Sequence, residues 1–179
     1  MIIMKKLLIA LTFITLFYGC SAIDELTKFD IDYNSNVTVP ANTAVNLPFM
    51  VGTPPVETSS ESKFESNETR KDLIEEIKLK RMRLTITAPE REDFSFLESI
   101  EIYMKAEGVE EIQIASLKPV PNDAGIQIEL DTSDADLKEY IKKDSFSLRV
   151  NTTTDEVIDN DIDIAILSVF AVDASIFGV

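Results

Sequence analysis

Short runs of alternating apolar and polar residues dominate this chain from residue 26 onward. Phe29, Ile31 and Tyr33 alternate with charged residues, and isoleucines recur at 162, 164 and 166. Successive side chains of a β-strand point to opposite faces, so a period of two predicts strands with one buried face. Comparable runs occupy 45–51, 78–87, 100–104, 112–115, 125–130 and 145–150. About eight or nine short strands with turn residues between them predict a mainly β chain, a single antiparallel β-sandwich.

Turn residues divide the predicted strands. The Asn-Ser-Asn stretch at 34–36 predicts a break in the first strand, and Pro40 ends it. Residues 57–69 are polar, with Phe64 as their one large apolar residue, and we expect an exposed loop with a short edge strand around that position. Gly108 lies between two alternating runs and predicts a hairpin.

Two segments have a helical rather than a strand pattern. Apolar residues at 73, 74 and 77, and again at 137, 140 and 141, follow the i, i+3, i+4 spacing of a helix face. The first predicts a helix over 69–77 and the second a helix around 137–141. Asp131 or Ser133 would cap the second helix. Both helices would lie in crossover connections between strands.

The one basic patch lies inside a predicted strand. Lys78, Lys80, Arg81 and Arg83 occur within ten residues of alternating pattern, on both parities of the strand. The chain has 32 acidic and 17 basic residues, so carboxylates are in surplus. We therefore interpret this patch as a solvated sheet face whose cations pair with nearby acids.

Composition argues against several functions. The formal net charge of −15 disfavours nucleic acid as a partner, because phosphate binding needs clustered Lys and Arg. The chain contains no His, which removes the commonest general base and transition-metal ligand. Its glycines number five and form no phosphate-binding loop. We expect no enzymatic activity, and assign no catalytic residue, no cofactor site and no metal site.

The N-terminus has the parts of a secretory signal. Lys5 and Lys6 precede an apolar run at 7–18, which ends at Gly19 and Cys20. The run is shorter than the roughly 20 apolar residues that a membrane-spanning helix needs. Cys20 is the only cysteine, so it has no partner for an intrachain disulfide.

The segment Leu16-Phe17-Tyr18-Gly19-Cys20 resembles the lipobox of bacterial lipoproteins, with departures at the second and third positions. Relaxed boxes of this kind are similar to those of Bacteroidota lipoproteins. The resemblance implies a signal peptide at 1–19, lipidation of Cys20 and a tether at 20–25. The alternating runs place the β-sandwich domain at 26–179. The lipobox resemblance also implies a cell-envelope location, most simply the outer membrane, facing the periplasm or the cell surface. The alternative is an ordinary secretory signal that leaves an incidental free thiol.

The order of strands and helical crossovers is similar to that of immunoglobulin-like sandwiches, including late-embryogenesis-abundant-type domains. The Cys…Trp…Cys pattern of immunoglobulin domains is missing, because the chain has one Cys and no Trp. The resemblance therefore implies architecture and no functional residue.

Several motifs are candidate sites, and each has a simpler explanation. The acidic runs at 131–136 and 155–163 contain the oxygen ligands that Ca²⁺ prefers, but neither matches the twelve-residue calcium loop. Paired carboxylates for glycoside hydrolysis arise by coincidence in so acidic a chain. Ser145 and Ser147 lie near Lys142 and Lys143 only in sequence. The sequons at 36–38, 67–69 and 151–153 are explained as polar turn residues.

The expected function is that of a lipid-anchored, non-enzymatic binding or structural module of the cell envelope. The alternatives are a surface glycan-binding or adhesion module and an accessory subunit of an envelope complex. The membrane would be contacted through lipidated Cys20, and an envelope protein or a glycan would be the further partner. The loops at 52–66 and 118–124 are rich in Pro, Ser and Asn and are the first candidates for partner contacts.

Overall fold

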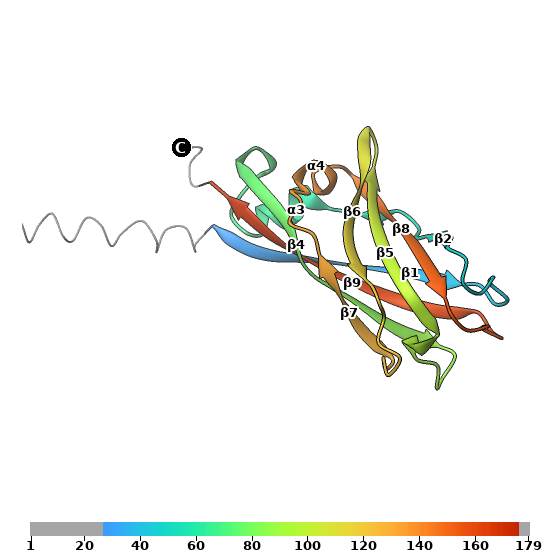
Figure 1. Ribbon diagram of the computed structural model, residues 1–179. Coiled ribbons are helices and arrows are strands. Elements are labelled where there is room, and N and C mark those ends of the chain that lie inside the picture. The colour runs from blue at the N-terminus through green and yellow to red at the C-terminus, as the bar shows by residue number, and fades with distance from the viewer. Residues whose placement is uncertain (1–26, 176–179) are drawn as a thin grey trace, which may run out of the picture.

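Nine antiparallel strands form one sheet that curls into the two layers of a β-sandwich (Figure 1). The computed structural model describes residues 27–175, so the signal peptide, Cys20 and the tether lie outside the described residues. The strand order is β1-β9-β4-β7-β6-β5-β8-β2, and β3 pairs with β8. The strands are β1 (Lys28–Val39), β2 (Phe49–Gly52), β3 (Val56–Glu57), β4 (Ile74–Ala88), β5 (Leu97–Ala106), β6 (Val109–Leu117), β7 (Gln127–Thr132), β8 (Ser145–Thr154) and β9 (Ile162–Ala174).

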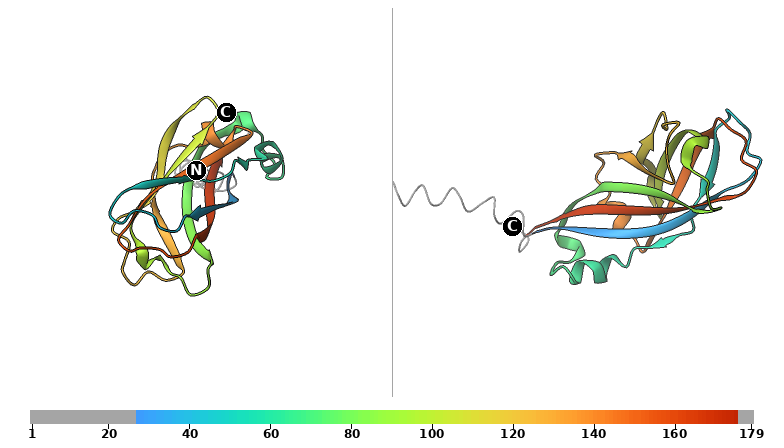
Figure 2. Two further views of the ribbon diagram at one scale, coloured as in Figure 1. Left: turned by 90° about the vertical axis from the view of Figure 1, so that its right-hand side faces the viewer. Right: turned by 90° about the horizontal axis from the view of Figure 1, so that it is seen from below.

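The sandwich is closed along one side and open along the other. Strand β7 pairs with β4 through residues 127–130 and with β6 through residues 131 and 132, which joins the two layers. The opposite side has two free edges: β1 ends one layer, and β2 and β3 together end the other. Figure 2 shows β1, β9 and β4 lying side by side as the long strands of the first layer. The predicted mainly β, antiparallel sandwich is confirmed.

The alternation of apolar and polar residues in the sequence matches the alternation of buried and exposed side chains in the structure. In β1, Ile31, Tyr33, Val37 and Val39 are buried, whereas every even-numbered residue is exposed. Strand β9 is paired between β1 and β4 and buries its even-numbered residues in the same way. Burial of a large apolar side chain contributes roughly 1.5–3 kcal/mol, so these faces, together with those of the other long strands, drive formation of the sandwich.

The predicted break at 34–36 does not occur. Strand β1 continues without interruption from Lys28 to Val39, and Asn34, Ser35 and Asn36 pair with Leu167, Ile166 and Ala165 of β9. Twelve paired positions outweigh the weak preference of Asn and Ser for turns. The prediction was wrong because it weighed local composition and not the length of the partner strand.

The helix predicted over 69–77 is mostly strand. Only a single 3₁₀ turn, η1 (Lys71–Leu73), forms before β4 begins at Ile74. A register shift between Ile74 and Glu76 places an extra residue between two buried isoleucines, Ile74 and Ile77. A β-bulge therefore produced the spacing of three that resembled a helix face.

A short helix replaces the edge strand predicted around Phe64. Helix α3 (Ser60–Glu65) is amphipathic over a single turn, and the side chain of Phe64 is completely buried. Phe64 contacts Phe29 edge to face, with 6.4 Å between the ring centroids. The segment therefore packs against the core and is not an exposed loop.

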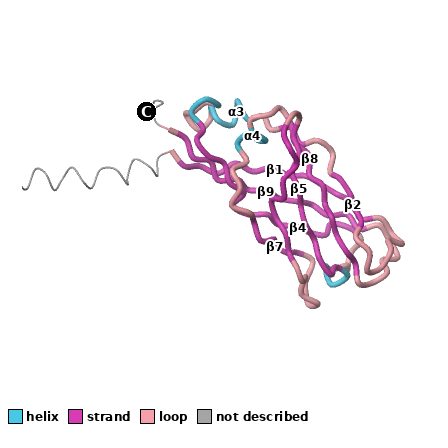
Figure 3. The backbone as a smooth tube through the Cα atoms, turned by 45° about the horizontal axis from the view of Figure 1, so that its top comes forward, coloured by secondary structure: helices cyan, strands magenta, loops and turns pink. Residues whose placement is uncertain are grey.

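The second predicted helix is confirmed as α4 (Lys138–Ile141), but its predicted caps are wrong. Strand β7 extends to Thr132, so Asp131 belongs to the strand, and Ser133 lies five residues before the helix. The carboxylate of Asp136 instead accepts hydrogen bonds from the backbone N–H groups of Ile77 and Lys138, each at 3.1 Å. Helices α3 and α4 both lie at the same end of the sandwich (Figure 3).

Candidate functional site

The two ends of the sandwich differ in what they carry. At the terminal end, the backbone N–H of Ala174 donates to the carbonyl of Thr27, and that of Ser175 donates to Leu73. The loop end is formed by the connections at 40–48, 89–96, 118–126 and 155–161, because β1, β4, β6 and β8 all run toward it. The first and last described residues therefore lie at the end opposite these four loops (Figure 1).

The loop end exposes large apolar side chains. Within residues 27–175 the large hydrophobic residues that are exposed are Leu47, Ile126, Val157 and Met50, with 60%, 58%, 62% and 66% of their surfaces accessible. The first three lie in loops at this end, and Met50 lies near it in β2. Single exposed apolar residues are common on protein surfaces, and here those of residues 27–175 are concentrated toward one end of the sandwich.

The loop that carries Leu47 is held against the loop that carries Val157. The backbone N–H of Asn42 donates to Ile158 O at 2.9 Å, and that of Asn46 donates to Thr154 O at 2.8 Å. Both asparagines have positive φ values, 57° and 59°, which Asn tolerates better than most residues. These contacts join the segment before Leu47 to the backbone on either side of Val157, so the two loops are held together.

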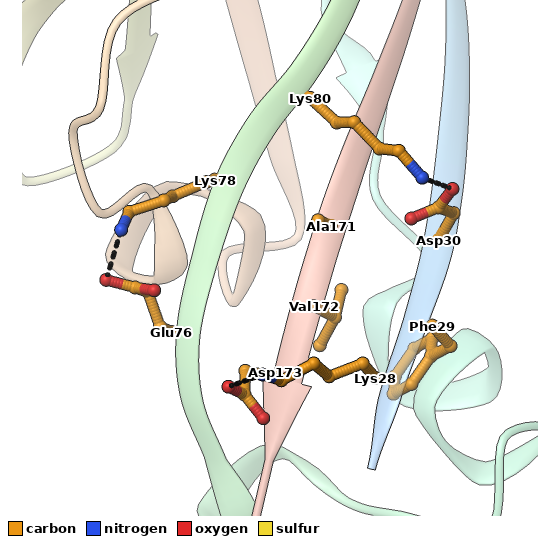
Figure 4. Close-up of a pocket in the computed structure, with 9 residues that line it drawn as sticks. All are labelled: Lys28, Phe29, Asp30, Glu76, Lys78, Lys80, Ala171, Val172 and Asp173. Carbon is orange, nitrogen blue, oxygen red and sulfur yellow. Dashed lines mark hydrogen bonds and ion pairs between the residues drawn. The ribbon is translucent and has the colours of Figure 1, made fainter. Parts of the chain in front are cut away.

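A cavity of about 580 Å³ lies on the outer face of the first layer, toward the terminal end. Figure 4 shows Lys80 of β4 reaching across β9 to Asp30 of β1, with 2.7 Å between Nζ and Oδ2. Lys78 pairs with Glu76 at 3.0 Å, and Lys28 with Asp173 at 3.5 Å. Every charged residue that lines this cavity is thus paired, and the cavity presents no free charge to a ligand.

A β-bulge in β4 explains why basic residues at both even- and odd-numbered positions lie on the outer face of the first layer. Leu79 pairs with Phe170 and Arg81 with Val169, so Lys80 is the extra residue between them. Lys80 and Arg81 consequently both lie on the exposed face. Arg83 pairs with Glu129 at 2.6 Å on the same face. The structure thus shows a solvated sheet face on which Lys78, Lys80 and Arg83 form ion pairs, as interpreted, whereas Arg81 is exposed and forms none with residues 27–175.

The outer face of the second layer carries a polar cluster around Tyr103. The guanidinium of Arg149 lies 4.1 Å from the ring centroid of Tyr103 and donates two hydrogen bonds to Glu111, from Nε at 2.9 Å and Nη2 at 2.6 Å. These hydrogen bonds lower the pKa of Glu111. One carboxylate oxygen of Glu101 accepts from Tyr103 Oη at 3.2 Å and from Asn151 Nδ2 at 2.8 Å.

The acidic runs form no metal site within the described residues. No group of three or more His, Cys, Asp or Glu residues in 27–175 is placed to hold a metal ion. Although burial raises the pKa of Asp136, its hydrogen bonds from Ile77 and Lys138 lower it below the ordinary value. Asp161 accepts from the backbone N–H of Ala41 at 2.8 Å, and Asp163 from Thr38 Oγ1 at 2.7 Å. These acids stabilise loops and strand edges.

The remaining candidates do not converge on one site. Lys142 Nζ donates to the carbonyl of Ile74, so it is directed toward β4 and not toward Ser145 or Ser147 of β8. The two loops predicted to contact a partner lie apart: 118–124 belongs to the loop end, whereas 52–66 runs along the open side to α3 at the terminal end. Sequence reasoning missed Leu47, Ile126 and Val157. The first two lay in the runs at 45–51 and 125–130 that were predicted as strands, and Val157 lay in an acidic run.

Comparisons with known proteins add little to this geometry. No family model and no curated protein matches the sequence. A chain of Desmodium yellow mottle tymovirus aligns over 84% of both chains at 10% identity, with a TM-score of 0.26. A chain of Cocksfoot mottle virus aligns over 85% of this chain and 86% of its own at 9% identity, with a TM-score of 0.27. A carbohydrate-binding module of the β-sandwich superfamily aligns over 83% of this chain and 55% of its own at 14% identity, with a TM-score of 0.26. Scores this low carry no argument about function.

Within the described residues, no helix has the length and apolar character that crossing a membrane requires.

Proposed function

We propose that this chain is a lipid-anchored protein of the bacterial cell envelope and a non-enzymatic binding module that presents its loop end to a partner protein. One observation carries the proposal: the described chain begins at the terminal end, whereas Leu47, Ile126 and Val157 are exposed at the opposite end. A tether from Cys20 would therefore leave the apolar loops facing away from the membrane.

The dimensions of the β-sandwich suit this arrangement. Strand β9 has 13 residues, which at about 3.3 Å per residue gives a strand of about 40 Å. The two acyl chains of a diacylglyceryl group are sufficient for stable anchoring, whereas one chain holds a protein only marginally. The net charge of −15 disfavours adhesion of the body to anionic lipid, which keeps the loops accessible.

The described side chains support binding and not catalysis. The chain has no His, and the clusters around Asp136, Glu101 and Glu111 are occupied by internal hydrogen bonds or ion pairs. A catalytic acid or base needs a free position beside the substrate, and paired carboxylates of this kind are typical of structural networks.

The anchor is tested by fractionating cells that express the wild type or the Cys20→Ala variant. The wild type should sediment with membranes and be released by detergent, and Cys20→Ala should be soluble. Ser21→Ala is the control and should behave as the wild type. A wild-type protein found wholly in the soluble fraction would contradict the proposed anchor.

The loop end is tested by incorporating a photo-crosslinking amino acid in place of Val157 or Leu47 in living cells. Both positions should yield the same crosslinked partner. Glu139, an exposed residue of α4 at the terminal end, is the control position and should not yield it. Equal crosslinking from Glu139, or none from Val157 and Leu47, would contradict the use of this surface.

Glycan binding is a second candidate function, which the cluster around Tyr103 favours. Glu101, Asn151 and Arg149 beside an aromatic ring are donors and acceptors of the kind that sugar hydroxyls bind, and a sugar would replace the internal hydrogen bonds that now join them. Binding would require Arg149 to move off the ring that it covers. A glycan array on which the wild type binds and Tyr103→Ala does not would support this function, whereas equal binding by both proteins would exclude the cluster.

A further inference from the structure

The open side of the sandwich contains a groove against the free edge of β1. A cavity of about 540 Å³ is lined by Asp32, Tyr33, Asn34, Ser35, Asn36, Pro54, Pro55, Val56, Glu57 and Lys63. Even-numbered residues of β1 face solvent and odd-numbered ones face the core. A cavity that touches both sets lies along the edge of the strand, and the other edge of β1 is occupied by β9.

Backbone groups of β1 point into this groove. Lys63 Nζ donates to the carbonyl oxygen of Asp32 at 2.6 Å from the side of α3, so the backbone groups of Asp32 face the free edge. The N–H and C=O of one strand residue share a side, and the side alternates along the strand. The backbone N–H and C=O groups of Asn34 and Asn36 therefore also face the groove. Within residues 27–175, no backbone hydrogen bond joins these groups to the far wall of the groove.

The two halves of this edge differ in protection. Toward the terminal end, Lys28, Asp30 and Asp32 carry charges, and Lys63 caps the edge. From Asn34 to Thr38 the side chains are uncharged and nothing caps the backbone in the described structure. Native proteins usually protect an edge strand with charge, proline or a covering segment. The unprotected half is thus the part of β1 that is open to pairing with another chain.

The opposite wall of the groove is not a pairing partner for β1. Pro54 and Pro55 have no backbone N–H, and they separate β2 from β3. Pro54, Pro55 and Val56 contribute accessible apolar surface to the same groove, whereas the ring of Tyr33 is buried, with Lys63 Nζ 4.0 Å from its centroid. The groove therefore offers a row of backbone donors and acceptors on one side and an apolar wall on the other.

From this arrangement we propose that an extended peptide segment of a partner protein adds to the sandwich as a strand along 34–38 of β1. Its backbone would pair with Asn34 and Asn36, and alternate side chains would face Pro55 and Val56 or the solvent. Small apolar residues suit the inner positions, and uncharged polar residues suit the outer ones. This site is separate from the loop end and from the anchor, so it goes beyond the proposed function and does not depend on it.

A single extended segment suits the groove better than a second copy of this chain. The β1 strand of a second copy has β9 beside it and the other layer behind it. Residues 54–56 already line the far side of the groove, so there is little room for a second sandwich. A second copy nevertheless remains one outcome that the test distinguishes.

The experiment uses peptides of about ten residues, the length of a long strand, selected from a random displayed library on the detergent-solubilised full chain. Selected peptides should bind the wild type and lose about tenfold in affinity for Asn36→Pro, which lacks the outward N–H. Asn36→Ala keeps that N–H and should bind within about threefold of the wild type. Proline is tolerated on an edge where its nitrogen faces away from the ladder, and circular dichroism would verify folding.

A second measurement leaves the protein unchanged. Methylating the backbone nitrogens of a bound peptide one at a time should abolish binding at every second position, because alternate N–H groups face β1. Three results would overturn the proposal: equal binding to Asn36→Pro, an N-methyl scan without a period of two, or a library that yields no binder. Sedimentation showing a wild-type dimer that Asn36→Pro dissociates would assign the edge to a second copy instead.

Discussion

At the scale of single residues, Tyr33 links the two layers where the sandwich is open. Its ring contacts Phe146 and Phe170 edge to face, at 5.3 Å and 5.8 Å between centroids. Its hydroxyl donates to the carbonyl oxygen of Thr58 at 2.9 Å. One side chain of the edge strand thus contacts β8, β9 and the segment before α3, which stabilises the side of the molecule that has no bridging strand.

Replacement of Tyr33 by Phe keeps the ring contacts and removes this hydrogen bond. The buried carbonyl of Thr58 loses its donor, so the free energy of unfolding should fall by about 1–2 kcal/mol. Tyr103→Phe is the matched control: its hydroxyl is near the surface and bonds Glu101, so its effect should be smaller. Urea unfolding monitored by circular dichroism measures both. An effect of Tyr103→Phe as large as that of Tyr33→Phe would contradict this account.

Tyr33 also predicts a loss of stability in alkali. Burial, and next the charge of Asp32, raise its pKa well above the ordinary tyrosine value of about 10. The unfolded chain loses this proton at about pH 10 and the folded chain only at higher pH. The resulting stability is present below pH 10 and is lost as pH rises above it. Unfolding free energies measured from about pH 8 to above pH 10 should therefore fall more steeply for the wild type than for Tyr33→Phe; parallel curves would contradict the assignment.

At the scale of elements, the alternation of apolar and polar residues identified the long strands. Where the prediction differs from the structure, the cause is a β-bulge or a long-range contact. The runs that became β1, β5, β8 and β9 were recognised because each buries one face along most of its length. The apparent helix over 69–77 was a strand with a bulge, because a bulge and a helix turn both space apolar residues three apart. No local pattern distinguishes the two.

Helix α3 shows what the sequence could not reveal at this scale. Phe64 is a single apolar residue in a polar segment, which also describes an exposed loop. Its burial depends on Phe29, 35 positions earlier in the chain, and on the open side of the sandwich that it covers. The open side itself follows from which strands pair, and pairing is a long-range property.

The bulge in β4 provides a prediction at this scale. Deleting Lys80 would remove the extra residue and leave Leu79 opposite Phe170 and Arg81 opposite Val169, so β4 should keep its register and the chain should still unfold cooperatively. Deleting Arg83, where the pairing with β9 is regular, would turn Leu84 and the residues after it toward the other face or break their pairing. The Arg83 deletion should therefore abolish cooperative unfolding or prevent soluble expression. Thermal unfolding compares the two variants, and a stable Arg83 deletion variant would show that the register of β4 is not fixed.

At the scale of the whole molecule, the sandwich has two ends that differ in what they expose. The described chain enters and leaves at the terminal end, and four loops with Leu47, Ile126 and Val157 form the other. The sequence predicted a partner surface in 118–124, which lies at the loop end, and in 52–66, which does not. Their separation could not be foreseen because it depends on the direction in which each strand runs.

The anchor is a sequence inference, and the orientation of the molecule follows from it. If Cys20 is acylated, the tether reaches the sandwich at Thr27 and the loop end faces away from the membrane. If the signal is cut elsewhere, no end of the sandwich is fixed relative to the membrane, although the groove beside β1 is unaffected. The site of cleavage therefore decides between an oriented module and a freely diffusing one.

Intact mass and peptide mass spectrometry of the protein purified from membranes of its own cells tests this claim most directly. The account predicts a mature chain that begins at Cys20 and carries a diacylglyceryl group on its sulfur, with Ser21 as the second residue. A chain that begins at Met1, or one whose Cys20 has a free thiol, would contradict it.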